Sequence, residues 1–238
     1  MNGKSIKRKA VILLSGGMDS SVVLAIATSM GFDCHVLTFD YGQRHNVELE
    51  AAKMQSVNQG AASYRIFKID IGMFGGSALT DHIDVPKNSV SIDDEMKIPI
   101  TYVPARNLIF LSVAAGFAET INARDIFIGV SSVDYSGYPD CRPEFIQSFE
   151  QSVNLGTRAA DEKLKFKIHA PLLTLTKEET VLKGIELGVD FGNTRTCYDP
   201  DKNGNPCGEC DSCILRAKGF KGAGIDDPVV LKAKSFKS

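Results

Sequence analysis

The stretch AVILLSGGMDSSVVL, residues Ala10–Leu24, predicts a strand, a tight turn and a helix in that order. Its beginning is apolar, as expected for a strand that is buried on both faces of a parallel sheet. Gly16 and Gly17 supply a turn in which no Cβ keeps a ligand away from the backbone. Asp19 and Ser20 then open an apolar helix, with capping side chains and free backbone N–H groups at its start. We therefore expect the first strand-turn-helix unit of an α/β fold here.

The turn of this unit predicts a phosphate-binding loop. Unpaired N–H groups and the helix dipole both favour a negative charge at a helix N-terminus. A Gly-Gly pair alone would favour an ordinary turn, but the full run SGGMDSS between strand and helix favours a phosphate site. The run is not a Walker A sequence, because no Gly-Lys-Ser/Thr follows it, and it is not GxGxxG. The expected nucleotide-binding residues of the loop are Leu14, Ser15, Gly16, Gly17, Met18, Asp19, Ser20 and Ser21.

The loop resembles the SGGxDS loop of the ATP pyrophosphatase superfamily, also called PP-loop or N-type ATP pyrophosphatases. In that superfamily the loop holds the β and γ phosphates of ATP and leaves the α phosphate open to attack. The resemblance implies an enzyme that uses ATP and Mg²⁺ to adenylate a substrate oxygen, with pyrophosphate as the leaving group. The loop by itself identifies a superfamily and not a substrate.

The composition sets limits on the class of protein. With 238 residues, 43% of them hydrophobic, the chain can form one large α/β domain or one domain with a small appendage. The net charge of −2 indicates no overall basic surface, so we expect no direct nucleic-acid partner, although a local patch stays open. No stretch has the length of a membrane span, and no secretory pattern follows the charged N-terminus. Six cysteines, four of them near the C-terminus, favour a reduced, cytoplasmic chain with a metal site.

Strand-like and helix-like segments alternate along the chain, which predicts an α/β fold with a doubly wound parallel sheet of the Rossmann-like class. With the strand order 3-2-1-4-5, the fourth strand lies beside the first. The superfamily resemblance implies the adenine nucleotide alpha hydrolase-like form of this fold. We expect an ATP-binding domain over 1–190 and a small zinc-binding segment over 191–238 packed on it, while 72–99 is typical of a long loop or lid. The further strands are expected at 34–39, 63–69, 125–130 and 165–169, and the further helices at 47–59, at 108–122, from 143 onward and at 176–188.

Two further stretches are expected to border the ATP site. The run DYGQRH, residues 40–45, follows the second strand, and open α/β sheets build ligand sites at the carboxyl ends of their strands. From this run we assign Asp40 to the nucleotide, and Tyr41 and Arg44 to the substrate; a polar loop with a turn glycine is the alternative. Arg106 lies in the first turn of a helix that a proline opens, where it forms either two hydrogen bonds with a phosphate or carboxylate or a surface salt bridge.

The segment SSVDYSGYPDCRPEF, residues 131–145, faces the phosphate loop across the switch point of a sheet with this strand order. Its aromatic rings can stack on a flat heterocycle, its carboxylates can accept paired N–H donors, and its arginine can neutralise an anion. Cys141 is more simply a bystander thiol than a nucleophile, because no base is placed for it. Lys177 opens a later helix, where it either reaches a phosphate or is solvated. The expected substrate residues of the segment are Tyr135, Tyr138, Arg142 and one or more of the carboxylates Asp134, Asp140 and Glu144, and Gly129 just before it is assigned to the nucleotide.

The cysteines near the C-terminus predict a metal centre. Their thiolates can converge on one ion, and tetrahedral sulfur coordination suits a structural Zn²⁺. Such an ion would tie a loop that is too poor in apolar residues to fold alone. An iron–sulfur cluster uses related spacings and is the main chemical alternative. The expected ligands are Cys197, Cys207, Cys210 and Cys213.

Several stretches together resemble one family within the superfamily, the 7-cyano-7-deazaguanine synthases of the queuosine pathway. These stretches span about Leu13 to Asp227, which is nearly the whole chain. The sequence departs from the family at Arg195-Thr196, where many members have Trp-Ser. The matching stretches are SGGMDSS, FDYGQRH, SALTD, YVPARN, VDYSGYPDCRPEF, GVDFGNTRTCY and CGECDSCILRAKGF.

The family resemblance implies a carbon–nitrogen ligase that converts 7-carboxy-7-deazaguanine, ATP and ammonia to the nitrile. The acid would be adenylated and attacked by ammonia to give the amide, and a second activation of the amide would give the nitrile. Free ammonium is the implied nitrogen source, because no glutaminase domain fits in this length, and a homodimer is implied as well. The catalytic roles implied by the resemblance fall to Asp19, Arg106, Arg142 and Lys177.

Two other functions compete with this one. A PP-loop enzyme that acts on tRNA, such as a thiolase or a lysidine-type synthetase, would use the same loop. It should carry a basic face or an RNA-binding domain, and this sequence indicates neither. A zinc-ribbon binding module without catalysis would explain the cysteines but would leave the SGGMDSS loop without a role.

Overall fold

A computed structural model of the chain describes residues 7–43, 47–88, 98–131 and 137–235. Its centre is a parallel sheet of five strands in the order β3-β2-β1-β4-β5, which confirms the predicted doubly wound topology. The first strand lies in the middle of the sheet, so the loop that follows it opens at the switch point between β1 and β4. The strands are β1 (Lys9–Leu13), β2 (Asp33–Asp40), β3 (Ser63–Lys68), β4 (Asp125–Phe127) and β5 (Lys167–His169).

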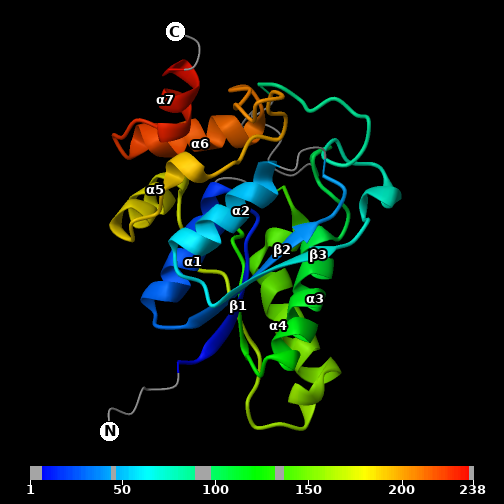
Figure 1. Cartoon of the computed structure of the whole chain (residues 1–238). Helices are drawn as coiled ribbons and strands as arrows, with labels where there is room; N and C mark the ends of the chain where they lie inside the picture. Colours follow the sequence, from blue (N-terminus) through cyan, green and yellow to red (C-terminus); the bar gives the residue numbers. More distant parts are fainter. Residues whose placement is uncertain (1–6, 44–46, 89–97, 132–136, 236–238) are drawn as a thin grey trace, which may run out of the picture.

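Helices cover both faces of the sheet. Figure 1 shows α1 (Met18–Ser29) and α2 (Val47–Asn58) on one face, and α3 (Arg106–Thr120) and α4 (Pro143–Gly156) on the other. Near the C-terminus the chain adds three more helices, and α6 packs against α5 beside the carboxyl ends of the strands. These helices are α5 (Lys177–Glu186), α6 (Asp211–Gly222) and α7 (Pro228–Ser235), and the short 3₁₀ turns are η1 (Gly72–Phe74), η3 (Pro139–Cys141), η4 (Arg158–Ala160) and η5 (Phe191–Asn193).

The apolar run of β1 supplies both hydrophobic cores. Side chains alternate along a strand, so Val11 and Leu13 pack into the core under α3 and α4. Ala10 and Ile12 point the other way and pack into the core under α1 and α2. Because neither face of β1 meets water, its sequence is continuously apolar rather than alternating.

Several boundaries differ from the sequence prediction. The strand expected at 125–130 ends at Phe127, because the chain beyond it turns toward the first turn of α1, where Gly129 lies against the Ser20 backbone. The helix expected at 108–122 begins at Arg106, after Ala105 with φ of +56°, which confirms that Arg106 lies in its first turn, and it ends at Thr120. The described part of the 72–99 segment is anchored rather than loose: Lys87 donates to Asp199 at 2.6 Å.

The C-terminal segment packs directly on the sheet domain. Phe220 of α6 is buried in the same core as β1 and α1, edge-to-face with Phe191 at 5.3 Å between ring centroids. Arg216 of α6 makes a bidentate ion pair with Asp227, with hydrogen bonds of 2.6 and 2.9 Å. It also donates to the hydroxyl of Thr194 at 2.8 Å, so its guanidinium ties α6 to the chain before the cysteines. The boundary between residues 190 and 191 as a domain division stays a prediction. Among the described residues, no helix combines the length and the apolarity needed to cross a bilayer.

The Arg216–Asp227 pair generates a stability prediction. Both side chains are less than a tenth exposed, so Asp227→Asn leaves a buried guanidinium without its counter-charge. We expect a loss of about 3–5 kcal/mol in the free energy of unfolding, measured by urea denaturation. Glu186→Gln is the control, because the Lys183–Glu186 pair on α5 is exposed and should contribute less than about 0.5 kcal/mol. Equal, small effects of the two changes would contradict the anchoring role of this pair.

Candidate active site

A cavity of about 300 Å³ opens at the carboxyl edge of the sheet. Its walls come from the loop after β1, the ends of β2 and β4, the start of α3, and the chain around Lys177, Arg195 and α6. This is the switch point at which open α/β sheets bind ligands. Of the expected nucleotide residues, the cavity is lined by Leu14, Ser15, Gly17, Met18, Asp19, Ser20 and Gly129.

Serine hydroxyls hold the phosphate loop in shape. Ser20 accepts from the backbone N–H of Ser15 at 3.2 Å and lies 3.0 Å from the Ser15 hydroxyl. Ser21 donates to the carbonyl of Gly17 at 2.8 Å, so it fixes the loop from beneath and does not line the cavity. Gly17 is the N-cap of α1 with extended backbone, and no side chain caps the helix. The N-terminus of α1 is therefore left available for an anion.

Gly16 and Gly129 serve close packing of backbones. Gly16 has φ of +86°, and a Cβ on it would lie 2.3 Å from the carbonyl oxygen of Glu48 and 2.7 Å from the amide nitrogen of Ala52. Gly16 thus faces α2 and not the cavity, which differs from the expectation that it lets a ligand approach. A Cβ on Gly129 would lie 3.1 Å from both the Cα and the N of Ser20, so the end of β4 packs directly on the first turn of α1.

Asp19 and Lys177 meet at the start of α1. The Lys177 Nζ donates to Asp19 Oδ2 at 2.7 Å, and Lys177 is buried rather than solvated. The other carboxylate oxygen, Asp19 Oδ1, is buried and has no hydrogen-bond partner among the described residues. A carboxylate oxygen in need of a partner, beside a phosphate loop, fits a Mg²⁺ ion that also binds phosphate oxygens.

Arg106 lies in a pocket of aromatic hydroxyls at the other end of the cavity. Burial alone would lower the pKa of Arg106, but Tyr41, Tyr138 and Tyr198 raise it above its ordinary value. Burial raises the pKa of Tyr41 and of Tyr198 in turn, so both phenols stay neutral. Arg106 is therefore a permanent cation beside neutral, polar rings, which suits a planar anionic substrate. Tyr198 lies next to a cysteine in the sequence, and nothing in its local pattern indicates this position.

The remaining expected site residues lie elsewhere. Asp140 is buried, and its Oδ2 accepts from the backbone N–H of Asn107 at 2.9 Å, so it holds the start of α3 and does not line the cavity. Arg142 is exposed at the N-cap of α4, and Asp40 is 3.9 Å from Lys68; neither lines the cavity. Arg44, Asp134 and Tyr135 lie outside the described residues.

Cys141 lines the cavity but is not activated. Burial, together with Asp140, raises the pKa of the Cys141 thiol to about 12. Its sulfur accepts a hydrogen bond from the Asn107 side chain at 3.3 Å. A thiol with this pKa is protonated near neutral pH, which agrees with the interpretation as a bystander.

Glu48 and Arg195 line the cavity and were not among the expected site residues. Glu48 lies in the first turn of α2, where desolvation raises the pKa of its carboxyl to about 7 against the opposing effect of Arg106. The backbone N–H of Arg195 donates to the carbonyl of Gly16 at 2.8 Å. Arg195, one of the two residues at which the sequence departs from the family pattern, thus contacts the phosphate loop. Its distance from that loop along the sequence does not indicate this contact.

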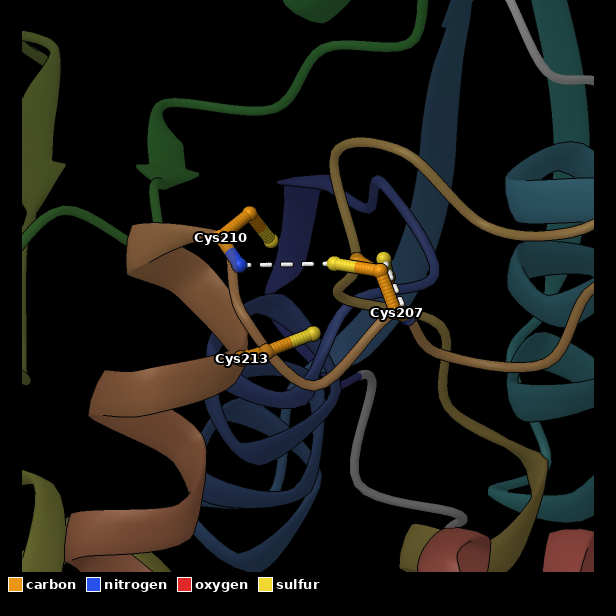
Figure 2. Close-up of side chains that lie close together, drawn as sticks. Cys207, Cys210 and Cys213 are labelled. Carbon is orange, nitrogen blue, oxygen red and sulfur yellow. Dashed lines mark hydrogen bonds between the residues drawn. The ribbon is translucent and has the colours of Figure 1, made fainter. Parts of the chain in front are cut away.

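The four predicted metal ligands converge beside this cavity. The sulfur atoms of Cys197, Cys207, Cys210 and Cys213 all lie within 4.8 Å of one another. Figure 2 shows the side chains of Cys207, Cys210 and Cys213 pointing toward a common centre. Backbone N–H groups already donate to two of these sulfurs: Cys210 to Cys207 at 3.3 Å, and Cys207 to Cys197 at 3.3 Å.

Comparison with known proteins identifies the family. The sequence model described as "Queuosine biosynthesis protein QueC" matches residues 9–224. The chain belongs to the QueC family. It is 56% identical to the 7-cyano-7-deazaguanine synthase of Desulfatibacillum aliphaticivorans over 93% of this chain and 96% of the relative. The Legionella pneumophila protein of the same name is also 56% identical, over 93% and 96% of the two chains.

A solved structure supports the fold of the QueC chain. The NMN synthetase from Francisella tularensis superposes with a TM-score of 0.51 at 15% identity, covering 97% of this chain and 84% of the other. At this identity the likeness concerns the arrangement of strands and helices alone. It agrees with the doubly wound sheet that the sequence predicts.

The contact between Gly129 and Ser20 generates a prediction for the site. Gly129→Ala should push the end of β4 away from α1, raise the KM for ATP and lower the free energy of unfolding by about 1–3 kcal/mol. Gly116→Ala is the matched control, since a Cβ on Gly116 meets nothing within 4 Å. Because Gly116 lies on the exposed face of α3, Gly116→Ala should stabilise the protein by about 0.5–1 kcal/mol and leave the KM for ATP unchanged. Steady-state kinetics and urea denaturation measure both, and an unchanged KM in Gly129→Ala would contradict the contact's role.

Proposed function

We propose that this chain catalyses the ATP-dependent conversion of 7-carboxy-7-deazaguanine and ammonia to 7-cyano-7-deazaguanine in queuosine biosynthesis. The observation that carries the proposal is the single cavity that joins the N-terminus of α1 to the Arg106 pocket. An anion site for ATP and a cationic, tyrosine-lined site for a flat acid are thus open to each other. Relatives at 56% identity over nearly the full length are named for this synthesis, which supports it.

The residues of the cavity divide the work of the reaction. Backbone N–H groups in the first turn of α1, which no side chain caps, would bind the ATP phosphates. Asp19 Oδ1 would hold Mg²⁺, which neutralises phosphate charge when bound, and Lys177 steadies Asp19 and adds a positive charge. Arg106 would bind the carboxylate of the acid, and the ring of Tyr138, which lines the cavity, would stack on the heterocycle. The acid oxygen then attacks the α phosphorus, and pyrophosphate leaves.

One site can serve both stages of the reaction. Ammonia displaces AMP from the adenylated acid to give the amide, whose oxygen is on the same carbon as before. A second activation at this oxygen followed by loss of AMP and of the nitrogen-bound protons gives the nitrile. Arg44, Asp134 and Tyr135 keep their predicted roles in substrate binding in this proposal. Arg142, Asp140 and Asp40 are left out of it, because they do not line the cavity.

A tRNA-acting PP-loop enzyme is the alternative, and the family match does not favour it. The net charge of −2 also argues against a large nucleic-acid surface, so we propose that no nucleic acid binds directly. All six cysteines are free, which is consistent with the reducing cytoplasm as the place of action.

We further propose a homodimer. The edge strand β3 and the turn that follows it expose large apolar side chains, whereas monomeric proteins usually cover or charge a sheet edge. A second copy of the chain would cover this surface. The exposed side chains are Ile66, Phe67, Met73 and Phe74.

The four cysteines would hold one structural Zn²⁺. Tetrahedral geometry with bonds of 2.3 Å places sulfur atoms about 3.8 Å apart, which is compatible with sulfurs that all lie within 4.8 Å of one another. An iron–sulfur cluster distributes its four cysteines over two or four irons, which holds some of the sulfur atoms farther apart than the 4.8 Å within which all four lie here. Because four protein ligands leave no open position, the ion would stabilise the loop and take no part in the reaction.

Turnover tests the proposed function. Purified protein with Mg-ATP, ammonium and 7-carboxy-7-deazaguanine should form the amide transiently and then the nitrile, with AMP and pyrophosphate, as followed by mass spectrometry. Asp19→Asn should lower kcat by roughly 100-fold or more, because the phosphate charge then lacks its metal ligand.

Asp33→Asn is the control for that loss, since Asp33 lies at the amino end of β2, on the edge of the sheet away from the cavity. It should keep wild-type kcat.

Light scattering on the wild-type protein should give the mass of two chains. A wild-type protein that binds ATP and forms no product from this acid would overturn the proposed substrate.

Metal analysis tests the cysteine site. Elemental analysis should find one Zn²⁺ per chain, and Cys210→Ser should lose most of it together with thermal stability, because a four-ligand site becomes a three-ligand site. Cys34→Ser should keep the metal, since Cys34 is buried at the start of β2, outside the cluster. Stoichiometric iron with sulfide in the purified protein would refute a zinc site.

A further inference from the structure

The proposed reaction needs a group that takes a proton from its nitrogen source. Near neutral pH, ammonia in water is almost entirely ammonium, which has no lone pair with which to attack a carbonyl carbon. The charged residues assigned so far are not placed for this task. Asp19 is paired with Lys177 at 2.7 Å, and Arg106 is a cation.

Glu48 lies in the cavity and has no such assignment. It lines the same cavity as the phosphate loop and Arg106. Its position is fixed by its backbone, because its carbonyl oxygen packs so closely on Gly16 that a Cβ there would come within 2.3 Å. The first turn of α2 therefore stays against the phosphate loop, and the Glu48 carboxylate stays at the reaction site.

A carboxylate in this cavity is unfavourable for the anionic substrates, since it repels both the ATP phosphates and the acid. The structure does not neutralise it by a close ion pair: in the part of the chain that is described, no hydrogen bond or salt bridge is made by the Glu48 carboxylate. Its position instead suits a small cation that arrives with the substrates.

The groups that face Glu48 bear on its protonation. Arg106 of α3 favours the carboxylate form, and Tyr41 after β2 is near enough for Glu48 to raise the pKa of its phenol. Desolvation outweighs Arg106 and raises the pKa of Glu48 to about 7. A carboxyl with this pKa exchanges a proton readily near neutral pH. The other charged residues that line the cavity are Asp19, Lys177, Arg195, Asp211 and Arg216.

We propose that Glu48 binds the ammonium ion in the cavity and acts as the general base that converts it to the attacking ammonia. This inference rests on the proposed function. It assigns a second, cationic substrate subsite to the wall formed by α2, opposite in charge to the sites for ATP and the acid.

This step balances in protons and electrons. An N–H bond of ammonium breaks, its proton goes to the Glu48 carboxylate, and the electron pair stays on nitrogen. The nitrogen then bonds to the acyl carbon, and the bond from that carbon to the AMP oxygen breaks with its electron pair on the phosphate. A second proton passes from the nitrogen to the solvent as the amide forms. Acyl-adenylate and ammonium thus give amide, AMP and two protons.

Glu48→Gln tests the proposal, because it keeps the shape of the side chain and removes the proton acceptor. At pH 7, kcat/KM for ammonium should fall by about 100-fold or more. ATP–pyrophosphate exchange driven by 7-carboxy-7-deazaguanine should stay within about threefold of wild type, since adenylation precedes the attack of nitrogen. Glu50→Gln, on the same turn of α2 but exposed, should match wild type in both assays.

Two further readouts separate a base from a merely structural residue. Hydroxylamine is largely neutral near pH 7 and needs no deprotonation, so Glu48→Gln should form the hydroxamate at close to the wild-type rate. The wild-type kcat/KM for total ammonium should rise with pH and level off above about 7, where Glu48 is ionised. In Glu48→Gln, kcat/KM for total ammonium should keep rising toward pH 9 as free ammonia accumulates. The difference from the wild-type value should therefore become smaller at high pH.

The outcomes also distinguish the two proposals. Wild-type protein without acid-dependent exchange would overturn the proposed function. Normal exchange in Glu48→Gln with equal losses for ammonium and hydroxylamine, or with a deficit that is constant over pH, would overturn the role of Glu48 alone. A normal rate with ammonium in Glu48→Gln would do the same.

Discussion

The close packing of Gly16 on the backbone of α2 determines how the walls of the cavity are arranged. Gly16 has a positive φ and no Cβ, so the carbonyl of Glu48 and the amide of Ala52 come nearer to it than any side chain would permit. On its other side, the Gly16 carbonyl accepts from the backbone N–H of Arg195. The phosphate loop is thereby clamped between α2 and the segment that leads to the cysteines. Any larger residue at position 16 would separate all three.

Charge inside the cavity follows a consistent arrangement. Lys177 is buried against Asp19, and Arg216 is buried against Asp227, so each of these charges has a partner that offsets the cost of its burial. Arg106 instead lies among neutral phenols and keeps its charge for a ligand. Positive potential is thus concentrated where the anionic substrates are proposed to bind, and the helix dipole of α1 adds to it.

The cysteine cluster connects the described part of the 72–99 segment with the loop that carries the cysteines. Ala78 and Val85 pack in one small apolar cluster with Cys210 and Cys213. Asn88 donates from its backbone to the carbonyl of Glu209 at 2.8 Å, next to the Lys87–Asp199 pair. An ion bound by the cysteines would therefore order the described residues of the 72–99 segment as well as its own loop, although it lies outside the reaction site.

The sequence by itself predicted the strand order, the loop after β1 as a phosphate site and the four cysteines that could hold a metal ion, because the patterns that indicate them lie close together in the chain. Apolar runs that end in glycine turns, capping serines at a helix start and cysteines at fixed spacing are local patterns with a local physical cause. The same reasoning left two alternatives for Lys177, contact with a phosphate or exposure to solvent, and it assigned Asp140 to the substrate. In the structure Asp140 instead caps α3 from across the sheet edge.

Only the tertiary structure decided which polar side chains share the cavity. Glu48 comes from one segment and Arg195 and Tyr198 from another, and they reach the site because long-range backbone contacts bring both segments to the phosphate loop. The pKa of Glu48 likewise depends on desolvation by distant neighbours and on the charge of Arg106. Burial and electrostatic environment are properties of the folded chain, and the spacing of residues along the sequence does not contain them.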